Sequence, residues 1–473
     1  MKTRMEADSI GTMEVPEEAY YGVQALRAKE NFPITGAPMN PVFLENLARI
    51  KKAAAITNRD AFALDAGYAE AIIRACDEVI KGRFREEFIV DAIQGGAGTS
   101  ANMNMNEVIA NRANELLGGE KGGYTRVHPN DHVNMAQSTN DVIPTAGKLT
   151  VLDLLKPLLT EFDRLKRELT IKATAFDDVI KMGRTQLQDA VPMRLGQTFH
   201  AYASMVERDR KRIADSCKEM YTVNLGGTAI GSAINVSDAY FYNVVPCLAR
   251  ITGYPLSQAA DLFDATENLD GFVAVSGAVK TCAVNLSKMC NDLRLLSSGP
   301  RTGLGEINLP AKQNGSSIMP GKVNPVIPEV VTQVAFLVVG HDTTITMAAE
   351  AGQMELNAFE PIIFYNLFES IETLTYAVKT LVDNCITGIT ANKEHCRSQV
   401  ENSIGVITAI CPYVGYETAA NIAKEALRTG RQVRDLILEK GLMDEEQLNT
   451  VLDPYTMTEP GILGKDPMEQ LRG

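Results

Sequence analysis

Residues 315–350 of the chain read GSSIMPGKVNPVIPEVVTQVAFLVVGHDTTITMAAE. The first part, residues 315–325, is rich in glycine, serine and proline, a composition typical of a loop. From residue 326 onward apolar side chains predominate and recur at helical spacing. A helix over residues 326–350 would be a rod of roughly 40 Å at about 1.5 Å per residue. This stretch therefore predicts a polar loop followed by one long helix.

The same helical pattern continues through most of the chain. Apolar residues follow one another at steps of three and four over residues 155–169, which places an apolar stripe on one face of a helix. Alternation typical of strands is scarce, and no strand–helix alternation typical of a parallel sheet is present. We therefore predict an all-α fold built on a bundle of long helices. The other long apolar stretches lie at about residues 43–54, 192–222, 265–297 and 355–387.

The composition narrows the possible partners. The chain has 473 residues, with 46 Lys and Arg against 59 Asp and Glu, and a formal net charge of −13. An acidic chain releases few counterions from phosphates, so we expect neither nucleic acid nor an anionic membrane as partner. The apolar runs are far shorter than the roughly 18 residues of a membrane span. The N-terminal residues MKTRMEADSIG lack the apolar core of a secretory signal, and the eight cysteines include no C-x-x-C pair. These features favour a cytoplasmic protein.

Loops rich in proline, glycine and asparagine separate the helical stretches, and we predict them at residues 94–106, 119–144, 182–192, 224–235 and 298–325. Four of them hold a polar cluster. The clusters are Gly95–Ser100, Gln137–Asp141, Arg184–Asp189, and Gly315–Ser317 followed by Lys322 and Asn324. In the last three, a proline (Pro144, Pro192 or Pro325) and then an apolar run follow, which predicts a helix start.

Two interpretations of these clusters remain open. The first is structural: the polar side chains cap helices and satisfy backbone N–H groups. The second is functional, because helix N-termini combine free N–H donors with the positive end of the helix dipole and bind carboxylates and phosphates. Several such termini, together with Lys322, would hold a small dianion without a strongly basic protein.

Other familiar catalytic patterns are missing from the sequence. It contains no phosphate-binding loop, no dinucleotide-binding glycine pattern and no G-x-S-x-G turn. None of the five histidines, at positions 128, 132, 200, 341 and 395, lies in a polar cluster. We therefore do not expect a histidine to be the catalytic base.

The polar clusters carry a family resemblance. GSSIMPGKVNP (315–325) is similar to the GSSxMPxKxN signature of the fumarase/aspartase superfamily. Four further blocks resemble the other blocks of that superfamily in order and approximate spacing. They are residues 98–113, 128–141, 183–193 and 225–231. The N-terminal AYYGVQALRAKENFPITG (19–36) and two C-terminal segments, VITAICPYVGYETA and LDPYTMTEPGILG, are similar to those of aspartate ammonia-lyases. The resemblance spans about residues 4–464.

The resemblance implies a three-domain, almost all-helical subunit. We expect an N-terminal domain at 1–140, a central bundle of long helices at 141–394 and a small C-terminal domain at 395–473. It also implies a homotetramer with a core of 20 helices and active sites assembled from loops of three subunits. The implied reaction is the reversible deamination of L-aspartate to fumarate, with Mg²⁺ as a possible activator and no required cofactor or metal ligand set.

The resemblance also implies roles for individual residues. Ser316 is the expected base, which removes a proton next to a carboxylate and leaves an aci-carboxylate. Gln186 is only a candidate contact for the amino group, because fumarases and some aspartases carry histidine at this position. The remaining expected contacts are Ser138, Thr139 and Ser317 for the β-carboxylate, Lys322, Asn324 and Thr185 for the α-carboxylate, and Thr99 and Asn140 for the amino group.

Some alternatives stay open. The first is a class II fumarase, which hydrates fumarate to malate. Two residues favour the ammonia-lyase branch over it. Gln186 is not a proton donor of the kind that a leaving hydroxide needs, and Ala97 replaces the serine that fumarases typically carry at this position. A helical tetramer without catalysis is the second. The segment from His128 to Asp131 either binds a second anion or simply forms a turn before the 138–141 cluster.

Overall fold

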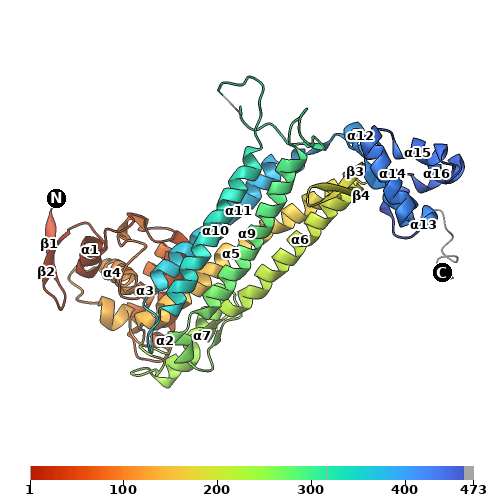
Figure 1. The fold of residues 1–473 in the computed structure, drawn as a ribbon. Helices are drawn as coiled ribbons and strands as arrows, with labels where there is room; N and C mark the ends of the chain where they lie inside the picture. The colour runs from red at the N-terminus through yellow and green to blue at the C-terminus, as the bar shows by residue number, and fades with distance from the viewer. Residues whose placement is uncertain (1, 316, 463–473) are drawn as a thin grey trace. The chain divides into compact units, whose positions relative to one another are not determined.

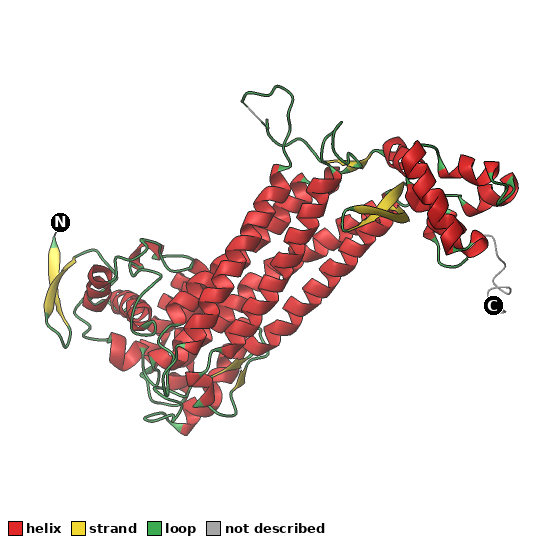
Figure 2. Cartoon of the chain, viewed as in Figure 1, coloured by secondary structure: helices red, strands yellow, loops and turns green. Residues whose placement is uncertain are grey.

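The computed structural model describes residues 2–315 and 317–462. Helices make up most of these residues, and the strands form four short two-stranded sheets (Figure 2). The all-α prediction is confirmed. The chain divides into two compact units, and each consists of three separate stretches. Unit 1 contains residues 1–160, 209–284 and 334–375, and unit 2 contains residues 161–208, 285–333 and 376–473. The three-domain division expected from the family stays a prediction.

Five long helices contribute residues to both units (Figure 1). They are α5 (Thr139–Ala175), α6 (Leu195–Ser216), α9 (Asp270–Leu296), α10 (Val326–Glu350) and α11 (Glu360–Asn384). The predicted helix at 326–350 coincides with α10. The predicted stretch at 192–222 is longer than α6, because the chain enters a short 3₁₀ helix (Cys217–Met220) after Ser216.

Shorter helices and strands complete unit 1. The helices are α1 (Val23–Asn31), α2 (Pro41–Asp60), α3 (Ala66–Ile80), α4 (Thr99–Leu116), α7 (Asp238–Thr252) and α8 (Asp264–Glu267). The strands are β1 (Thr3–Ala7), which pairs antiparallel with β2 (Thr12–Pro16), and β5 (Thr222–Val223), which pairs parallel with β6 (Ser257–Gln258).

Aromatic side chains hold the helices of unit 1 together. The ring of Phe364 on α11 lies 5.7 Å from that of Phe43 on α2 and 5.3 Å from that of Phe272 on α9. Gly147 on α5 faces the same ring, and a Cβ at this position would lie 2.3 Å from it. The close packing of α5 and α11 therefore depends on a glycine.

Unit 2 contains two more pairs of strands and the C-terminal helices. Strand β3 (Ile180–Thr185) pairs with β4 (Gln188–Arg194), and β7 (Ile307–Asn308) pairs with β8 (Thr390–Ala391), both antiparallel. Apolar side chains of the short helices pack with Met182 of β3 into one core. The C-terminal helices are α12 (Lys393–Asn402), α13 (Cys411–Val414), α14 (Tyr416–Thr429), α15 (Val433–Glu439) and α16 (Glu445–Val451).

Three local predictions were wrong. Residues 182–192 were expected to be a loop and instead form most of the β3–β4 hairpin, with Pro192 inside β4. Residues 94–106 were also expected to be a loop, but α4 begins at Thr99. Pro144 lies inside α5, which begins at Thr139, so this proline does not mark the helix start. Glycine and proline content predicted irregular backbone in all three places, and tertiary contacts outweighed it.

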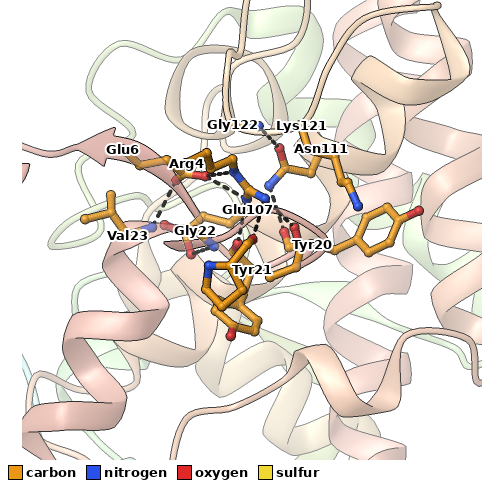
Figure 3. A network of polar contacts seen from close by, with 12 residues as sticks. Arg4, Glu6, Tyr20, Tyr21, Gly22, Val23, Glu107, Asn111, Lys121 and Gly122 are labelled. Carbon is orange, nitrogen blue, oxygen red and sulfur yellow. Dashed lines mark hydrogen bonds and ion pairs between the residues drawn. The ribbon is translucent and has the colours of Figure 1, made fainter. Parts of the chain in front are cut away.

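Two buried carboxylates, Glu6 of the N-terminal hairpin β1–β2 and Glu107 of α4, both bind the start of α1 (Figure 3). Glu107 of α4 accepts hydrogen bonds from the backbone N–H groups of Gly22, at 2.9 Å, and of Gln24, at 2.8 Å. Glu6 of β1 accepts one from Val23 N–H at 3.0 Å. The two carboxylates thus satisfy the free N–H groups at the start of α1. Burial raises the pKa of Glu107 to about 7.

One helix is unusually apolar on its outside. By length and composition alone α10 is able to cross a membrane, with a mean hydropathy of 1.2 over its most apolar window. Only 33% of that window is buried within this single chain. The exposed large apolar residues of α10 are Val330, Phe336, Leu337, Val339 and Met347.

Candidate active site

The predicted site residues fall into two groups, one in each unit. Thr99, Ser138, Thr139 and Asn140 belong to unit 1, and the others belong to unit 2. Ser316, the predicted base, lies outside the described residues. The unit 2 residues that the structure describes are Thr185, Gln186, Ser317, Lys322 and Asn324.

In unit 1 the structure brings the starts of two helices together. Thr99 begins α4 and Thr139 begins α5. Asn102, one turn into α4, donates a hydrogen bond of 3.3 Å from Nδ2 to Oγ1 of Thr139. The two polar clusters at 95–100 and 137–141, which are separate in the sequence, therefore form one surface made of two helix N-termini.

A buried aspartate adds a third segment to this surface. Both carboxylate oxygens of Asp141, in the first turn of α5, accept backbone hydrogen bonds: Oδ1 from Ser138 N–H at 3.0 Å, and Oδ2 from Gly226 N–H at 3.0 Å and Thr228 N–H at 3.1 Å. The loop 224–229 is thereby held against the start of α5. Burial raises the pKa of Asp141 to about 6, although these three N–H groups lower it.

Lys51 of α2 lies underneath the two helix starts. Its Nζ donates hydrogen bonds to Oδ1 of Asn102 at 2.7 Å and to Oδ1 of Asn134 at 2.9 Å. Because the side chain is buried, its pKa is lowered to about 7, and nearby Asp141 opposes this shift. Sequence reasoning missed Lys51 and Asn102. The only available signal was a lysine inside the apolar stretch at 43–54.

The hydroxyl groups of this surface fall into two kinds. Oγ1 of Thr139 accepts a hydrogen bond from Asn102, and Oγ of Ser138 accepts one from Asn140 N–H at 3.2 Å. Both hydroxyls keep their own O–H for an anion. The hydroxyl of Thr99 instead donates to Gly96 O at 2.8 Å, so its oxygen is available as an acceptor.

Asn140 also presents an acceptor. Its Nδ2 donates to the carbonyl of Ala229 at 2.7 Å, which orients the amide and leaves Oδ1 for a donor. Acceptors at Thr99 and Asn140 suit an ammonium group, whereas donors at Ser138 and Thr139 suit a carboxylate.

A hollow of about 150 Å³ opens beside Thr99. Arg27 of α1 lines it and is held by Asp8 through two hydrogen bonds of 3.0 Å each. Sequence reasoning did not single out Arg27, because it lies in a block (19–36) in which no polar cluster is apparent.

In unit 2 the candidate residues lie on a hairpin turn and a loop. Thr185 ends β3, and Gln186 follows it in the turn, where both are exposed. Ser317 and Lys322 are exposed in the loop before α10. Asn324 lies just before that helix, and its Nδ2 donates to Gly315 O at 2.8 Å.

The backbone closes the base of this loop as well. Gly315 N–H donates to the carbonyl of Lys322 at 2.9 Å, and a Cβ at Gly315 would lie 2.5 Å from that oxygen. Only a glycine fits here, so the glycine of the GSSIMPGKVNP motif has a structural reason.

The segment 128–131 begins a short π-helix (Pro129–Val133), and His128 caps its N-terminus. Nδ1 of His128 accepts hydrogen bonds from the backbone N–H groups of Asn130 at 3.2 Å and of Asp131 at 3.3 Å. These contacts favour the capping interpretation of the two that the sequence left open.

The described residues show no cluster of side chains typical of a metal site. Over residues 2–315 and 317–462, no three or more His, Cys, Asp or Glu side chains gather where they would hold a metal ion.

Comparisons with known proteins identify the family of the chain. A family model described as lyase matches residues 11–340, and one described as fumarase C C-terminus matches residues 406–459. The chain is 54% identical over 462 residues to an aspartate ammonia-lyase of a Bacillus species, covering 98% of this chain and 99% of that protein. It is 52% identical over 467 residues to the aspartate ammonia-lyase of Bacillus subtilis strain 168, covering 99% and 98%.

The chain belongs to the aspartate ammonia-lyase family. As a member of this family it is a carbon–nitrogen lyase. Two solved structures share its fold. A fumarate lyase:delta crystallin from Brucella melitensis bound to cobalt has a TM-score of 0.95 at 50% identity, and covers 97% of this chain and all of that one. A class II fumarase from Schistosoma mansoni has a TM-score of 0.94 at 35% identity, with the same coverage. The ammonia-lyases are thus more similar in sequence than this fumarase.

Proposed function

We propose that the chain catalyses the reversible elimination of ammonia from L-aspartate to give fumarate. The observation that carries this proposal is its identity of 52–54% to aspartate ammonia-lyases over nearly its full length. The hydroxyl and amide geometry in unit 1 supports it, because donors for a carboxylate and acceptors for an ammonium group lie on one surface.

The first step is removal of a proton from the carbon next to the β-carboxylate. Ser316 is the base, and the electron pair of the broken C–H bond moves into that carboxylate to give an aci-carboxylate. Ser138, Thr139 and Ser317 donate hydrogen bonds to its oxygens. Donors aimed at developing charge are among the largest contributions to catalysis, and removal of one typically costs about 10²–10³ in rate.

The second step breaks the carbon–nitrogen bond. The aci-carboxylate collapses, a carbon–carbon double bond forms, and the bonding pair leaves with nitrogen as neutral ammonia. Thr99 and Asn140 accept hydrogen bonds from the ammonium group before it leaves, with Gln186 as a further contact. Lys322, Asn324 and Thr185 bind the α-carboxylate throughout. Ammonia leaves directly from an ammonium group, so no histidine acid is needed at position 186.

The oligomer is part of the proposal. The apolar, exposed face of α10 is expected to be buried in a protein–protein interface, and an interface with further copies of the same chain is the simplest arrangement. We infer a cytoplasmic homotetramer with a core of 20 helices, in which three subunits contribute to each active site. The described residues show no cluster of three or more metal ligands. No step is routed through a metal, and Mg²⁺ as an activator stays a prediction.

The test is to incubate the purified chain with fumarate and ammonium and to identify the product by chiral chromatography. L-aspartate is expected, and L-malate as the only product would overturn the proposal in favour of a fumarase. Ser316→Ala is expected to lower kcat by about 10²–10⁴, the usual contribution of a general base. Parental activity in this variant would show that the base is a different group.

A further inference from the structure

The turn that carries Gln186 has an unfavourable backbone. Gln186 and Leu187 connect β3 to β4, and their φ angles are +52° and +63°. A two-residue turn of this kind normally contains asparagine or glycine, because larger side chains are strained in the left-handed region. Strained backbone persists where the surroundings hold it in place. The strands next to this turn must therefore be well anchored.

A bulge lies opposite Gly183 in this hairpin. The pairing register of β3 and β4 shifts between Met182 and Arg184, so that Gly183 stands opposite two residues of β4. This part of β3 carries two cations, Lys181 and Arg184, and both reach the same carboxylate. A Cβ at Gly183 would lie 2.7 Å from the carbonyl of Val191, so this bulge requires glycine.

One carboxylate faces both cations. Glu306 is fully buried (0% exposed), and its Oε1 pairs with Nη1 of Arg184 while its Oε2 lies 3.2 Å from Nζ of Lys181. The two cationic side chains are themselves only 14% and 6% exposed. The contact with Arg184 is a charge-assisted hydrogen bond, whereas the contact with Lys181 is an ion pair, since Nζ of Lys181 donates its hydrogen bond to Met182 O. Loss of the carboxylate would leave two buried cations without this counter-charge.

Glu306 is itself held from two sides. Its backbone N–H donates to Leu296 O at 2.8 Å, and its carbonyl accepts from Asn392 N–H at 2.9 Å. Arg184 also donates from Nη2 to Oε1 of Gln399 on α12 at 3.3 Å. Through these contacts Glu306 and Arg184 connect the β3–β4 hairpin to the end of α9 and to α12, all within unit 2.

We propose that Glu306 is a positioning residue: its buried carboxylate, by pairing with Lys181 and Arg184 of β3, sets the position of the Thr185–Gln186 turn. This inference rests on the proposed function for the roles of Thr185 and Gln186. Glu306 acts through Arg184 on the α-carboxylate of the substrate, and does not touch the substrate itself.

The experiment compares Glu306→Gln, Glu306→Asp and a control, Asp178→Asn. Asp178 forms an exposed ion pair with Lys393 in the same unit, so its loss is expected to have little effect. A misplaced Thr185 weakens substrate binding in the ground state and transition state alike. Glu306→Gln is therefore expected to raise the KM for L-aspartate about tenfold or more, with kcat within about threefold of the parent. Glu306→Asp keeps the negative charge, so its KM for L-aspartate is expected to lie between those of the parent and of Glu306→Gln.

Hydrogen exchange gives a readout that needs no catalysis. Amides of the segment 183–189 are expected to exchange faster in Glu306→Gln than in the parent, with no change in Asp178→Asn. An unchanged KM, with kcat falling in step with Tm, would reduce Glu306 to a purely structural role and overturn the inference. Unchanged hydrogen exchange over residues 183–189 in Glu306→Gln would overturn the inference too. This measurement does not depend on activity: if the parent protein does not convert aspartate, the proposed function fails, but the exchange result still tests the role of Glu306. If Glu306→Gln does not fold, the kinetic constants and the hydrogen exchange of Glu306→Asp test the inference in its place.

Discussion

Nζ of the buried Lys51 donates a hydrogen bond of 2.7 Å to Oδ1 of Asn102, and Asn102 in turn donates to the hydroxyl of Thr139. This chain links a buried cation on α2 to the surface formed by the starts of α4 and α5. Because the Thr139 hydroxyl accepts this hydrogen bond, its own O–H remains available to donate to a ligand. Catalysis by preorganised donors depends on such support.

The first prediction concerns Lys51 itself. Lys51→Met keeps the shape of the side chain but leaves the buried Oδ1 of Asn102 without its donor. We therefore expect kcat/KM to fall by at least about tenfold and stability by about 1–3 kcal/mol. Steady-state kinetics and thermal unfolding measure the two effects. The adjacent Lys52→Met is the control, because Lys52 forms only a half-exposed pair with Asp77 at 2.6 Å. Equal losses in both variants would contradict the role of Lys51.

The pH dependence of stability offers a second prediction. Burial lowers the pKa of Lys51 to about 7 from 10.5, so the unfolded chain binds this proton more tightly. Stability from Lys51 therefore rises with pH between these two values. Between about pH 7 and pH 9 the parent should gain about 2 kcal/mol relative to Lys51→Met. Tm measured across this range checks the sign, and parallel curves for the two proteins would refute it.

Gly22 provides a third prediction, about the N-terminal attachment. A Cβ at this position would lie 2.6 Å from Oε2 of Glu6, 2.6 Å from the hydroxyl of Tyr124 and 2.8 Å from the carboxyl carbon of Glu107. Gly22→Ala is expected to lower the free energy of unfolding by about 1–3 kcal/mol. Gly123→Ala is the control, because its new methyl would meet its nearest atom at 3.8 Å. Equal Tm values for the two variants would disprove the close packing at Gly22.

The fourth prediction concerns the proposed tetramer. Phe336 on α10 is 67% exposed in the single chain, and a glutamate there would place a charge in a buried apolar interface. Phe336→Glu is expected to dissociate the tetramer and to abolish activity, as seen by sedimentation and kinetics. Phe62→Glu is the control, since Phe62 is 97% exposed and lies outside the long helices. A stable tetramer in Phe336→Glu would exclude α10 from the interface.

Much of the fold was predictable from apolar spacing alone. The helix at 326–350 coincides with α10, and the apolar stripe at residues 155–169 is buried within α5. Such spacing indicates which face of a helix is buried, and in a long helix this periodic pattern is the strongest signal in the sequence. The β3–β4 hairpin was not predictable, because its turn uses Gln186 and Leu187 in place of the usual asparagine and glycine.

The candidate site was only partly predictable. Family resemblance supplied the hydroxyl and amide residues, and the structure joins those of unit 1 into one surface. Lys51, Asn102 and Glu306 were missed, because each acts through a contact between residues far apart in the sequence. A lone lysine or glutamate in a sequence carries no sign that it will be buried and paired.

The most direct test of the central claim is to follow the ultraviolet absorbance of fumarate as the purified chain acts on L-aspartate and, in a parallel sample, on L-malate. The account predicts that fumarate forms from L-aspartate, with release of an equal amount of ammonia, and that L-malate gives none above the enzyme-free control. Formation of fumarate from L-malate but not from L-aspartate would contradict the account.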